Sequence, residues 1–214
     1  MRSCTQARGS RSNLGKAGAR AMGRSRRFDP ERRSRIIDAT LGLIAADGVA
    51  GVSHRKVAAH ADVPLGSMTY HFANMDELLR EAFERFTRSV AARFERRLAA
   101  AHGFTEAVEA VVDIIHVDVF ATREDLVLTQ EFYALTARRP DFRDVLDEWM
   151  HNSRNELQRH FDPVTARQID ALIEGLTMHR ALSGHGYDRA LTLDAVRRIA
   201  AGATDATNRT DGRG

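Results

Sequence analysis

An all-α fold is predicted by three observations on this sequence of 214 residues. Apolar residues recur at helical spacing nearly to the C-terminus, and no segment alternates apolar and polar residues cleanly enough for a strand. Residues 53–72 have the pattern of two short helices joined by a tight turn, with a polar face that buries nothing. With 43% hydrophobic residues, the chain is expected to bury an ordinary globular core.

The first 27 residues form a basic tail. They hold eight Arg or Lys and no acidic residue, so the remaining residues carry a net charge of −5, given +3 for the whole chain. The tail has almost nothing to bury and is predicted to be disordered; no apolar run follows its charges, so no signal peptide is expected. It is either an arm that contacts nucleic-acid phosphates or the minor groove, or an extension ahead of a start at Met22.

The first of the two short helices is predicted to begin after Ser53, whose hydroxyl can cap it. The run Asp62-Val63-Pro64 would stop this helix and start the next one at a fixed angle. Its apolar stripe is formed by Val57, Ala58 and Ala61.

The second short helix would face the core through Met68 and Phe72, which lie one turn apart. The residues left outside would be Gly66, Ser67, Thr69, Tyr70 and His71. Small residues at its start allow close approach to base edges, so the pair is predicted to be a helix-turn-helix that reads DNA.

The segment from Arg35 to Leu79 resembles the tetracycline-repressor (TetR) family of bacterial regulators. The resemblance rests on an ordered set of motifs: Arg35-Ile36-Ile37-Asp38-Ala39-Thr40-Leu41, Asp47-Gly48, Ser53, Val57-Ala58, Ala61-Asp62-Val63, Gly66-Ser67, Tyr70-His71-Phe72 and Asp76-Glu77-Leu78-Leu79. One position departs from the family pattern: Met75 stands where the family usually carries a phosphate-binding lysine. Asn74 is still expected to cap the fourth helix.

The resemblance implies an N-terminal three-helix helix-turn-helix domain over residues 28–80 and a helical ligand-binding and dimerisation domain over 81–202, with a frayed tail at 203–214. It also implies double-stranded operator DNA as partner, bound by a homodimer because one short helix reads only a few base pairs. The residues implied to contact DNA are Ser53, His54, Arg55, Lys56, Leu65, Gly66, Ser67, Thr69, Tyr70 and His71. Among them, Arg55 is suited to guanine because its planar fork matches the O6 and N7 acceptors.

Six further helices are predicted downstream from helical periodicity and from Gly and Pro breakers. They span about residues 76–101, 105–119, 123–138, 142–160, 165–183 and 193–201. Family members generally dimerise through the last two large helices, which implies an interface formed by Ile169, Leu172, Ile173, Leu176, Val196 and Ile199. The same stripe can instead face the core of its own monomer.

The other helices are expected to enclose an apolar or aromatic small-molecule inducer. The expected lining is Phe120, Phe132, Tyr133, Trp149 and Met178, with His116 or Glu131 fixing the polar end of the ligand. Large side chains at helical spacing belong to a core more often than to a pocket, so a purely structural role remains open for each.

Two other classes of function are weighed against this interpretation. Asp113-x-x-His116 and Glu148-x-x-His151 share the layout of a di-iron carboxylate enzyme, but Glu131 is the one obvious further ligand. A structural partner protein would leave Arg55 and Tyr70 unexplained. No metal or cofactor is expected, since phosphate-loop, dinucleotide and paired-cysteine motifs are missing from the sequence. No apolar run could span a membrane, and the lone Cys4 favours a reducing cytoplasm.

Overall fold

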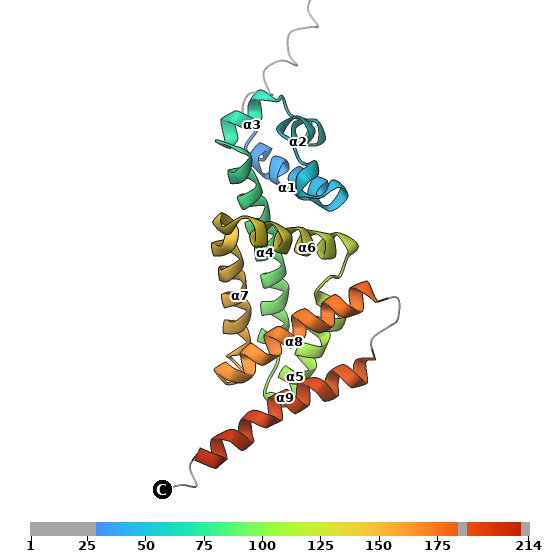
Figure 1. Cartoon of the computed structure of the whole chain (residues 1–214), viewed down its shortest axis with the longest axis vertical. Coiled ribbons are helices and arrows are strands. Elements are labelled where there is room, and N and C mark those ends of the chain that lie inside the picture. The colour runs from blue at the N-terminus through green and yellow to red at the C-terminus, as the bar shows by residue number, and fades with distance from the viewer. Residues whose placement is uncertain (1–28, 184–187, 211–214) are drawn as a thin grey trace, which may run out of the picture. The chain divides into compact units, whose positions relative to one another are not determined.

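The computed structural model describes residues 29–183 and 188–210, and all regular structure in this part of the chain is helical (Figure 1). The α-helices are α1 (Arg32–Asp47), α2 (His54–His60), α3 (Gly66–His71), α4 (Met75–Ala99), α5 (Phe104–Asp113), α6 (Arg123–Arg138), α7 (Arg143–Leu157), α8 (Pro163–Leu182) and α9 (Arg189–Thr210). Short turns lie at η1 (Val49–Gly51), η2 (Ile114–Asp118) and η3 (Pro140–Phe142). The all-α prediction is confirmed for these residues, and the predicted basic tail lies outside them.

Helices α1, α2 and α3 pack with the first turns of α4 into a small domain, called here the reading head. Met68 and Phe72 of α3 are buried, as their spacing predicts. The Ser53 hydroxyl caps α2 by accepting from the Lys56 N–H at 3.3 Å. At the other end of α2, Asp62 has a φ of 50° and the Val63 N–H donates to the Ala58 carbonyl at 3.0 Å. This C-terminal cap turns the chain sharply toward α3.

Helix α4 belongs to both parts of the molecule. Its start is a reciprocal cap, in which Asn74 Oδ1 accepts from the Glu77 N–H at 2.9 Å and Glu77 Oε2 accepts from the Ala73 N–H at 2.6 Å. Leu78 and Ala82 are buried in the core of the reading head. Later turns of the same helix are buried in the regulatory domain, so the predicted domain boundary at residues 80 and 81 lies inside one continuous helix.

The regulatory domain is built on α4, with α7 running alongside it (Figure 1). One core lies among α4, α6 and α7 and includes Ile44 near the end of α1; the rings of Phe83 and Phe132 stack there at 4.6 Å between centroids. A second core lies among α5, α8 and α9. The sequence predicts the same helices, and the predicted boundaries differ from the observed ones by a few residues.

The last helix is longer than the sequence predicts. Helix α9 begins at Arg189 and continues to Thr210, whereas residues 193–201 are predicted as helical and Gly202 is expected to end the helix. A glycine inside a helix costs about 1 kcal/mol relative to alanine, so Gly202 disfavours this continuation without preventing it. The frayed tail over residues 203–214 stays a prediction, and residues 211–214 lie outside the described part.

Candidate nucleic-acid interface and ligand pocket

The exposed face of α2 and α3 brings together most of the residues implied to contact DNA. Tyr70 is 83% exposed and Leu65 54% exposed, on a domain whose other large apolar residues are mostly buried. Arg55 is exposed and forms no hydrogen bond or ion pair with the described residues. Its guanidinium is therefore available for a ligand. The other exposed members of the set are Ser53, Lys56, Gly66 and Thr69.

The structure corrects the assignment of Ser67 to the DNA-contacting residues, because its side chain is 8% exposed and does not lie on the outer face. At 100° per residue, the inner face of α3 is made by positions 67, 68, 71 and 72, while Gly66, Thr69 and Tyr70 point outward. His71 accordingly is half-buried. His54 is also half-buried, and its Nε2 atom has no hydrogen-bond partner among the described residues.

Lys56 is exposed but already has a partner. Its Nζ atom lies 3.0 Å from Asp47 Oδ2 at the end of α1. An exposed pair of this kind contributes no more than about 1 kcal/mol, so the lysine can exchange the carboxylate for a phosphate.

Arg33 holds α3 in place and was not singled out from the sequence. Its guanidinium stacks 4.5 Å from the ring centroid of Phe72 and donates to the His71 carbonyl and to Glu81, with Nε 3.1 Å from Oε2. The hydrogen bond to Glu81 raises the pKa of Arg33. The spacing of Glu77 and Glu81, one turn apart at the start of α4, is the sequence signal that could have indicated a basic partner.

A cavity of about 20 Å³ lies among α4, α6, α7 and α8, and two of the seven predicted pocket residues, Phe120 and Trp149, line it. Phe132 is fully buried behind Trp149, at 6.3 Å between ring centroids. Tyr133 stacks on Trp149 at 6.2 Å, nearly parallel to it. The full lining is Val90, Arg93, Phe94, Val119, Phe120, Asp125, Thr129, Trp149, Ser153, Asp170, Ile173 and Glu174.

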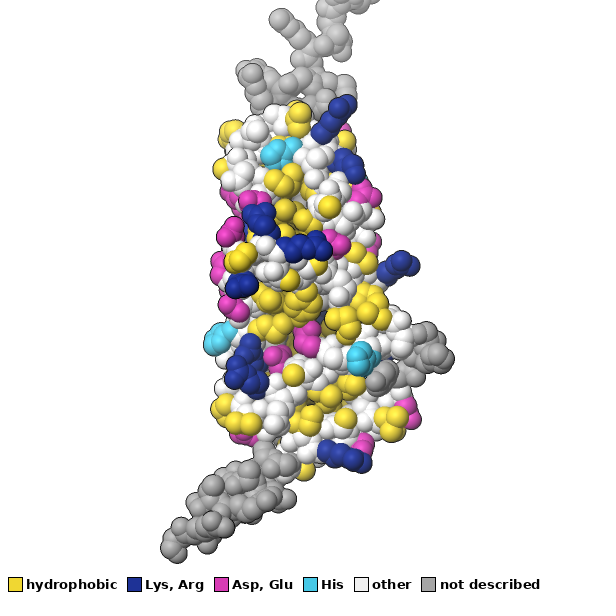
Figure 2. Space-filling model, in the orientation of Figure 1, with side chains coloured by type: hydrophobic (Ala, Val, Ile, Leu, Met, Phe, Trp, Pro, Cys, Tyr) yellow, Lys and Arg dark blue, Asp and Glu magenta, His cyan; other side chains and the backbone are white. Residues whose placement is uncertain are grey.

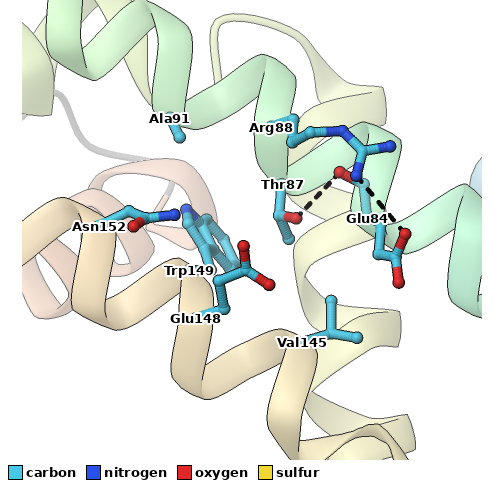
Figure 3. A pocket seen from close by; sticks show the side chains of 8 residues that line it. All are labelled: Glu84, Thr87, Arg88, Ala91, Val145, Glu148, Trp149 and Asn152. Carbon is cyan, nitrogen blue, oxygen red and sulfur yellow. Dashed lines mark hydrogen bonds and ion pairs between the residues drawn. The ribbon is translucent and has the colours of Figure 1, made fainter.

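Trp149 also lines a second pocket, which lies between α4 and α7. Figure 3 shows the indole extending from α7 toward α4, with Glu148 beside it and Glu84 and Arg88 on the facing helix. Glu148, one of the five residues of the di-iron hypothesis, is exposed at this surface.

His116, Glu131 and Met178 do not line this cavity, although Glu131 lies with Phe120 in the lining of a more open pocket between α6 and the end of α8. His116 lies in η2, a π-helical turn whose wider spacing directs the side chain to α9, where Nε2 is 2.9 Å from Thr192 Oγ1. Glu131 lies 200° around α6 from Thr129 and instead accepts from the Val49 N–H at 2.8 Å. Met178 lies beyond the cavity, where its sulfur accepts from Gln130 at 3.0 Å.

The sequence analysis missed the polar side chains of the cavity, which include Arg93 and three carboxylates. Asp125 lies 3.2 Å from Arg93, Asp170 lies 3.4 Å from Arg154, and Glu174 accepts from the Tyr133 hydroxyl at 2.7 Å. Burial raises the pKa of Glu174 and raises that of Asp170 to about 6. Burial, with Glu174 close by, also raises the pKa of Tyr133. The available signal was the placement of Asp170 and Glu174 one turn apart and directly after the buried Ile169 and Ile173.

The predicted dimer residues divide into two sets. Ile169, Ile173 and Val196 are buried within the core of α5, α8 and α9, so their assignment to an interface is wrong. Leu172, Leu176 and Ile199 lie at the edge of that core and remain partly exposed. The apolar stripe is wider than one contact surface, and its centre is used within the monomer.

The residues of the di-iron hypothesis are engaged elsewhere. Asp113 lies 3.3 Å from Arg97 and 2.8 Å from Arg189, and His151 Nε2 lies 2.9 Å from Asn155. Across the described ranges, no three His, Cys, Asp or Glu side chains are grouped as a metal site would need. Within the same ranges, none of the helices has the length and apolar character to cross a membrane.

Two family models match the chain. Residues 36–82 match the model for bacterial regulatory proteins of the tetR family, and residues 102–202 match a tetracyclin repressor-like C-terminal domain. The HTH-type transcriptional regulator BetI of Cronobacter sakazakii is 30% identical over 193 residues, covering 82% of this chain and 94% of the relative.

Solved structures agree with this assignment. The protein SCO7518 of Streptomyces coelicolor A3(2) is 57% identical, with a TM-score of 0.77 over 80% of this chain and 99% of that one. The multidrug binding protein EbrR, in complex with ethidium, is 36% identical with a TM-score of 0.65, over 79% of this chain and 99% of its own. The chain therefore belongs to the TetR family of DNA-binding transcriptional regulators and not to the di-iron enzymes.

Proposed function

We propose that this chain is a repressor that binds a palindromic operator as a homodimer and is released by a small molecule bound beside Trp149. The observation that carries the proposal is the course of α4. Its first turns hold the reading head through Leu78 and Ala82, and its later turns line the cavity through Val90, Arg93 and Phe94. A ligand that displaces α4 in the cavity therefore acts on the helix that carries the head.

The size of the cavity supports release by a change in population. About 20 Å³ is room for roughly one water molecule, so an aromatic ligand enters only if the lining side chains and helices move apart. Such a ligand binds the opened state and excludes the closed one. The ligand then shifts the equilibrium between the closed and the opened state by the difference between its affinities for them. Ligand-controlled DNA release requires such a difference.

Relatives support an aromatic ligand. EbrR has been solved in complex with ethidium, with proflavin and with malachite green, and these complexes are 34–36% identical to this chain. The aromatic lining of Phe94, Phe120 and Trp149 offers an apolar surface for such a ligand in this protein.

A second contact links the regulatory domain to the head. Glu131 of α6 accepts the Val49 N–H next to Gly48, where α1 ends. A Cβ on Gly48 would lie 3.1 Å from this carboxylate, and the glycine has a φ of 73°. Glu131 thus connects the two parts of the protein.

The test of the proposal is DNA binding and release. Footprinting on DNA beside the chain's own gene should reveal a two-fold symmetric site, with half-sites about 34–36 Å apart. A screen of aromatic compounds should find ones that quench Trp149, the sole tryptophan of the chain, and release that DNA. Failure to bind any such site, or release by compounds that leave Trp149 emission unchanged, would argue against it.

Dimerisation is tested separately with Leu176→Arg. Leu176 is partly exposed at the edge of the α8–α9 core, and a charge buried there between two copies would lack a partner. Light scattering should report a folded monomer with much weaker operator binding. The neighbouring exposed change Ala171→Arg is the control, and a stable dimer of the Leu176 variant would move the interface elsewhere.

A further inference from the structure

The cavity beside Trp149 adjoins a larger pocket that is open to solvent. This pocket, called here the entry pocket, lies between α6 and the end of α8 and has a volume of about 570 Å³, against about 20 Å³ for the cavity. Phe120 is half-buried and is the residue common to both linings. Its side chain therefore forms part of the wall between a space that a ligand reaches from solvent and a space that it does not.

Phe120 is held in an unusual backbone conformation. Its φ is 51°, in the left-handed region that bulky residues rarely adopt and that persists only where the surrounding structure enforces it. On one side the Val119 N–H donates to the Ile114 carbonyl at 2.9 Å, and on the other side Thr122 caps α6. From α8, Arg180 donates to the Val119 carbonyl at 3.4 Å, a longer distance than in an ordinary hydrogen bond. A return of Phe120 to negative φ would therefore relieve strain and redirect its ring, and it would disturb one weak contact with α8.

The other large side chains in the cavity wall are more firmly held. Trp149 also lines the pocket between α4 and α7, but it lies inside a helix, is 7% exposed and contacts three neighbouring rings. These rings belong to Phe86, Phe132 and Tyr133. Phe94 borders a further groove on that side and is 5% exposed within α4. Phe120 lies in a turn and contacts none of the other aromatic rings that the structure describes. The wall should therefore open most easily at Phe120.

From this arrangement we infer that Phe120 is the gate of the Trp149 cavity, and that a ligand enters through the entry pocket. The inference rests on the proposed function for the existence of a ligand, and adds its route and the residue that limits its size. Half-exposed or exposed apolar side chains of the entry pocket, Leu126, Val127 and Leu182, offer a first contact surface for an apolar molecule. Figure 2 shows hydrophobic side chains on the surface between α6 and α8. Outward rotation of the Phe120 ring would also add the space of that ring to the small cavity.

A cysteine inside the cavity reports opening of the gate without any ligand. Thr129 is 2% exposed and lines the cavity. Thr129→Cys is combined with Cys4→Ser, so that the chain carries a single thiol, and its labelling by methyl methanethiosulfonate is followed by mass spectrometry. Phe120→Ala should raise the labelling rate about tenfold or more, and Phe120→Trp should lower it about threefold or more, because the rate follows the population of the open state.

Two tryptophan substitutions distinguish the routes. Val127→Trp narrows the entry pocket and should slow the labelling, whereas Asn152→Trp narrows the pocket between α4 and α7 and should not. Phe104→Ala, which removes a 50% exposed ring at the start of α5, is the matched control for the loss of a phenyl group. Rates indifferent to both Phe120 substitutions, an equal acceleration by Phe104→Ala, or a larger effect of Asn152→Trp than of Val127→Trp would overturn the inference.

Ligand entry is measured separately, in chains without the added cysteine. The uncharged aromatic probe N-phenyl-1-naphthylamine is mixed with the protein in stopped flow, and Trp149 emission reports its association, which Phe120→Ala should accelerate. If labelling follows Phe120 but aromatic compounds leave the operator complex intact, the gate stands and the proposed function fails. If a compound releases the operator while association and labelling ignore Phe120, the proposed function stands and the gate fails.

Discussion

The reading head and the Trp149 cavity use their polar side chains in opposite ways. On the head, Arg55 and Tyr70 project into solvent; Arg55 forms no hydrogen bond or ion pair with the described residues, and the Tyr70 ring packs edge-on against that of its neighbour His71. In the cavity, Asp170 is buried and lies 3.4 Å from Arg154, and the half-buried Glu174 accepts from the Tyr133 hydroxyl. Substitutions on the head are therefore expected to change DNA binding alone. Substitutions in the cavity change stability, pH response and ligand binding together.

The largest difference between the two regions should appear in the free energy of unfolding. Phe132 is fully buried and stacks on Phe83 at 4.6 Å, so Phe132→Ala should lower the free energy of unfolding by about 3–5 kcal/mol. Tyr70→Ala, at an 83% exposed position, should change it by no more than about 0.5 kcal/mol. Urea denaturation of both variants measures this. Similar losses of unfolding free energy in the two variants would show that Tyr70 contributes to the stability of the fold despite its exposure.

The pH response should come from the cavity. Burial raises the pKa of Asp170 to about 6 from 3.8, although Arg154 and Arg167 lower it. The folded state thus binds the proton more tightly than the unfolded state. The free energy of unfolding should fall, by on the order of 3 kcal/mol from this group, as pH rises from about 4 to 6.

Asp170→Asn should flatten the fall in stability between these pH values. Denaturation curves across that range measure the slope, and Asp147→Asn, exposed on α7, is the control. An unchanged slope for the Asp170 variant would mean that its carboxylate is solvated in the folded state.

Substitutions on the reading head should change DNA affinity without changing the free energy of unfolding. Arg55→Ala should cost about 1–3 kcal/mol of operator affinity per half-site and relax one base position, because a bidentate guanine contact is lost. Tyr70→Phe should weaken all sequences alike and less strongly, as for a phosphate contact. Anisotropy titrations with operator and scrambled duplex distinguish the two, and an unaltered operator affinity for Arg55→Ala would remove it from the base-reading set.

The smallest expected effect lies at the contact between the regions. Glu131→Ala leaves the Val49 N–H without its acceptor, which should lower the free energy of unfolding by about 1 kcal/mol. More ligand should then be needed to release DNA, because α6 no longer holds the end of α1. Dose–response curves of operator release, with exposed Glu124→Ala as control, test this link.

The fold could be predicted from the sequence because its signals are local. Helical spacing, the caps at Ser53 and Asn74 and the breakers around Pro140 act within a few residues, and the structure confirms those caps. The cavity could be predicted only in part. Glu174 and Tyr133 are 41 positions apart, and nothing local to either residue indicates that α6 and α8 bring them together.

Errors on the head and in the regulatory domain have a common cause. Ser67 and Ile173 have the residue types expected at their assigned surfaces, yet both face inward. A sequence pattern indicates that a helix is amphipathic, but the angle at which it packs decides the residues at the edge of each face. His116 adds a second cause, since the π-helical turn η2 shifts the register of the residues that follow.

Because α4 is long, a small tilt at its cavity end produces a large displacement at the reading head. Its 25 residues span about 37 Å, so a tilt of about 5° at the cavity end moves the head end by about 3 Å. In a symmetric pair both heads would move, which alters their separation by up to about 6 Å. Major-groove faces recur every 34–36 Å along one side of the duplex, and each base pair adds about 3.4 Å. A side-chain displacement no larger than the width of an aromatic ring would thus put the pair out of phase with its operator.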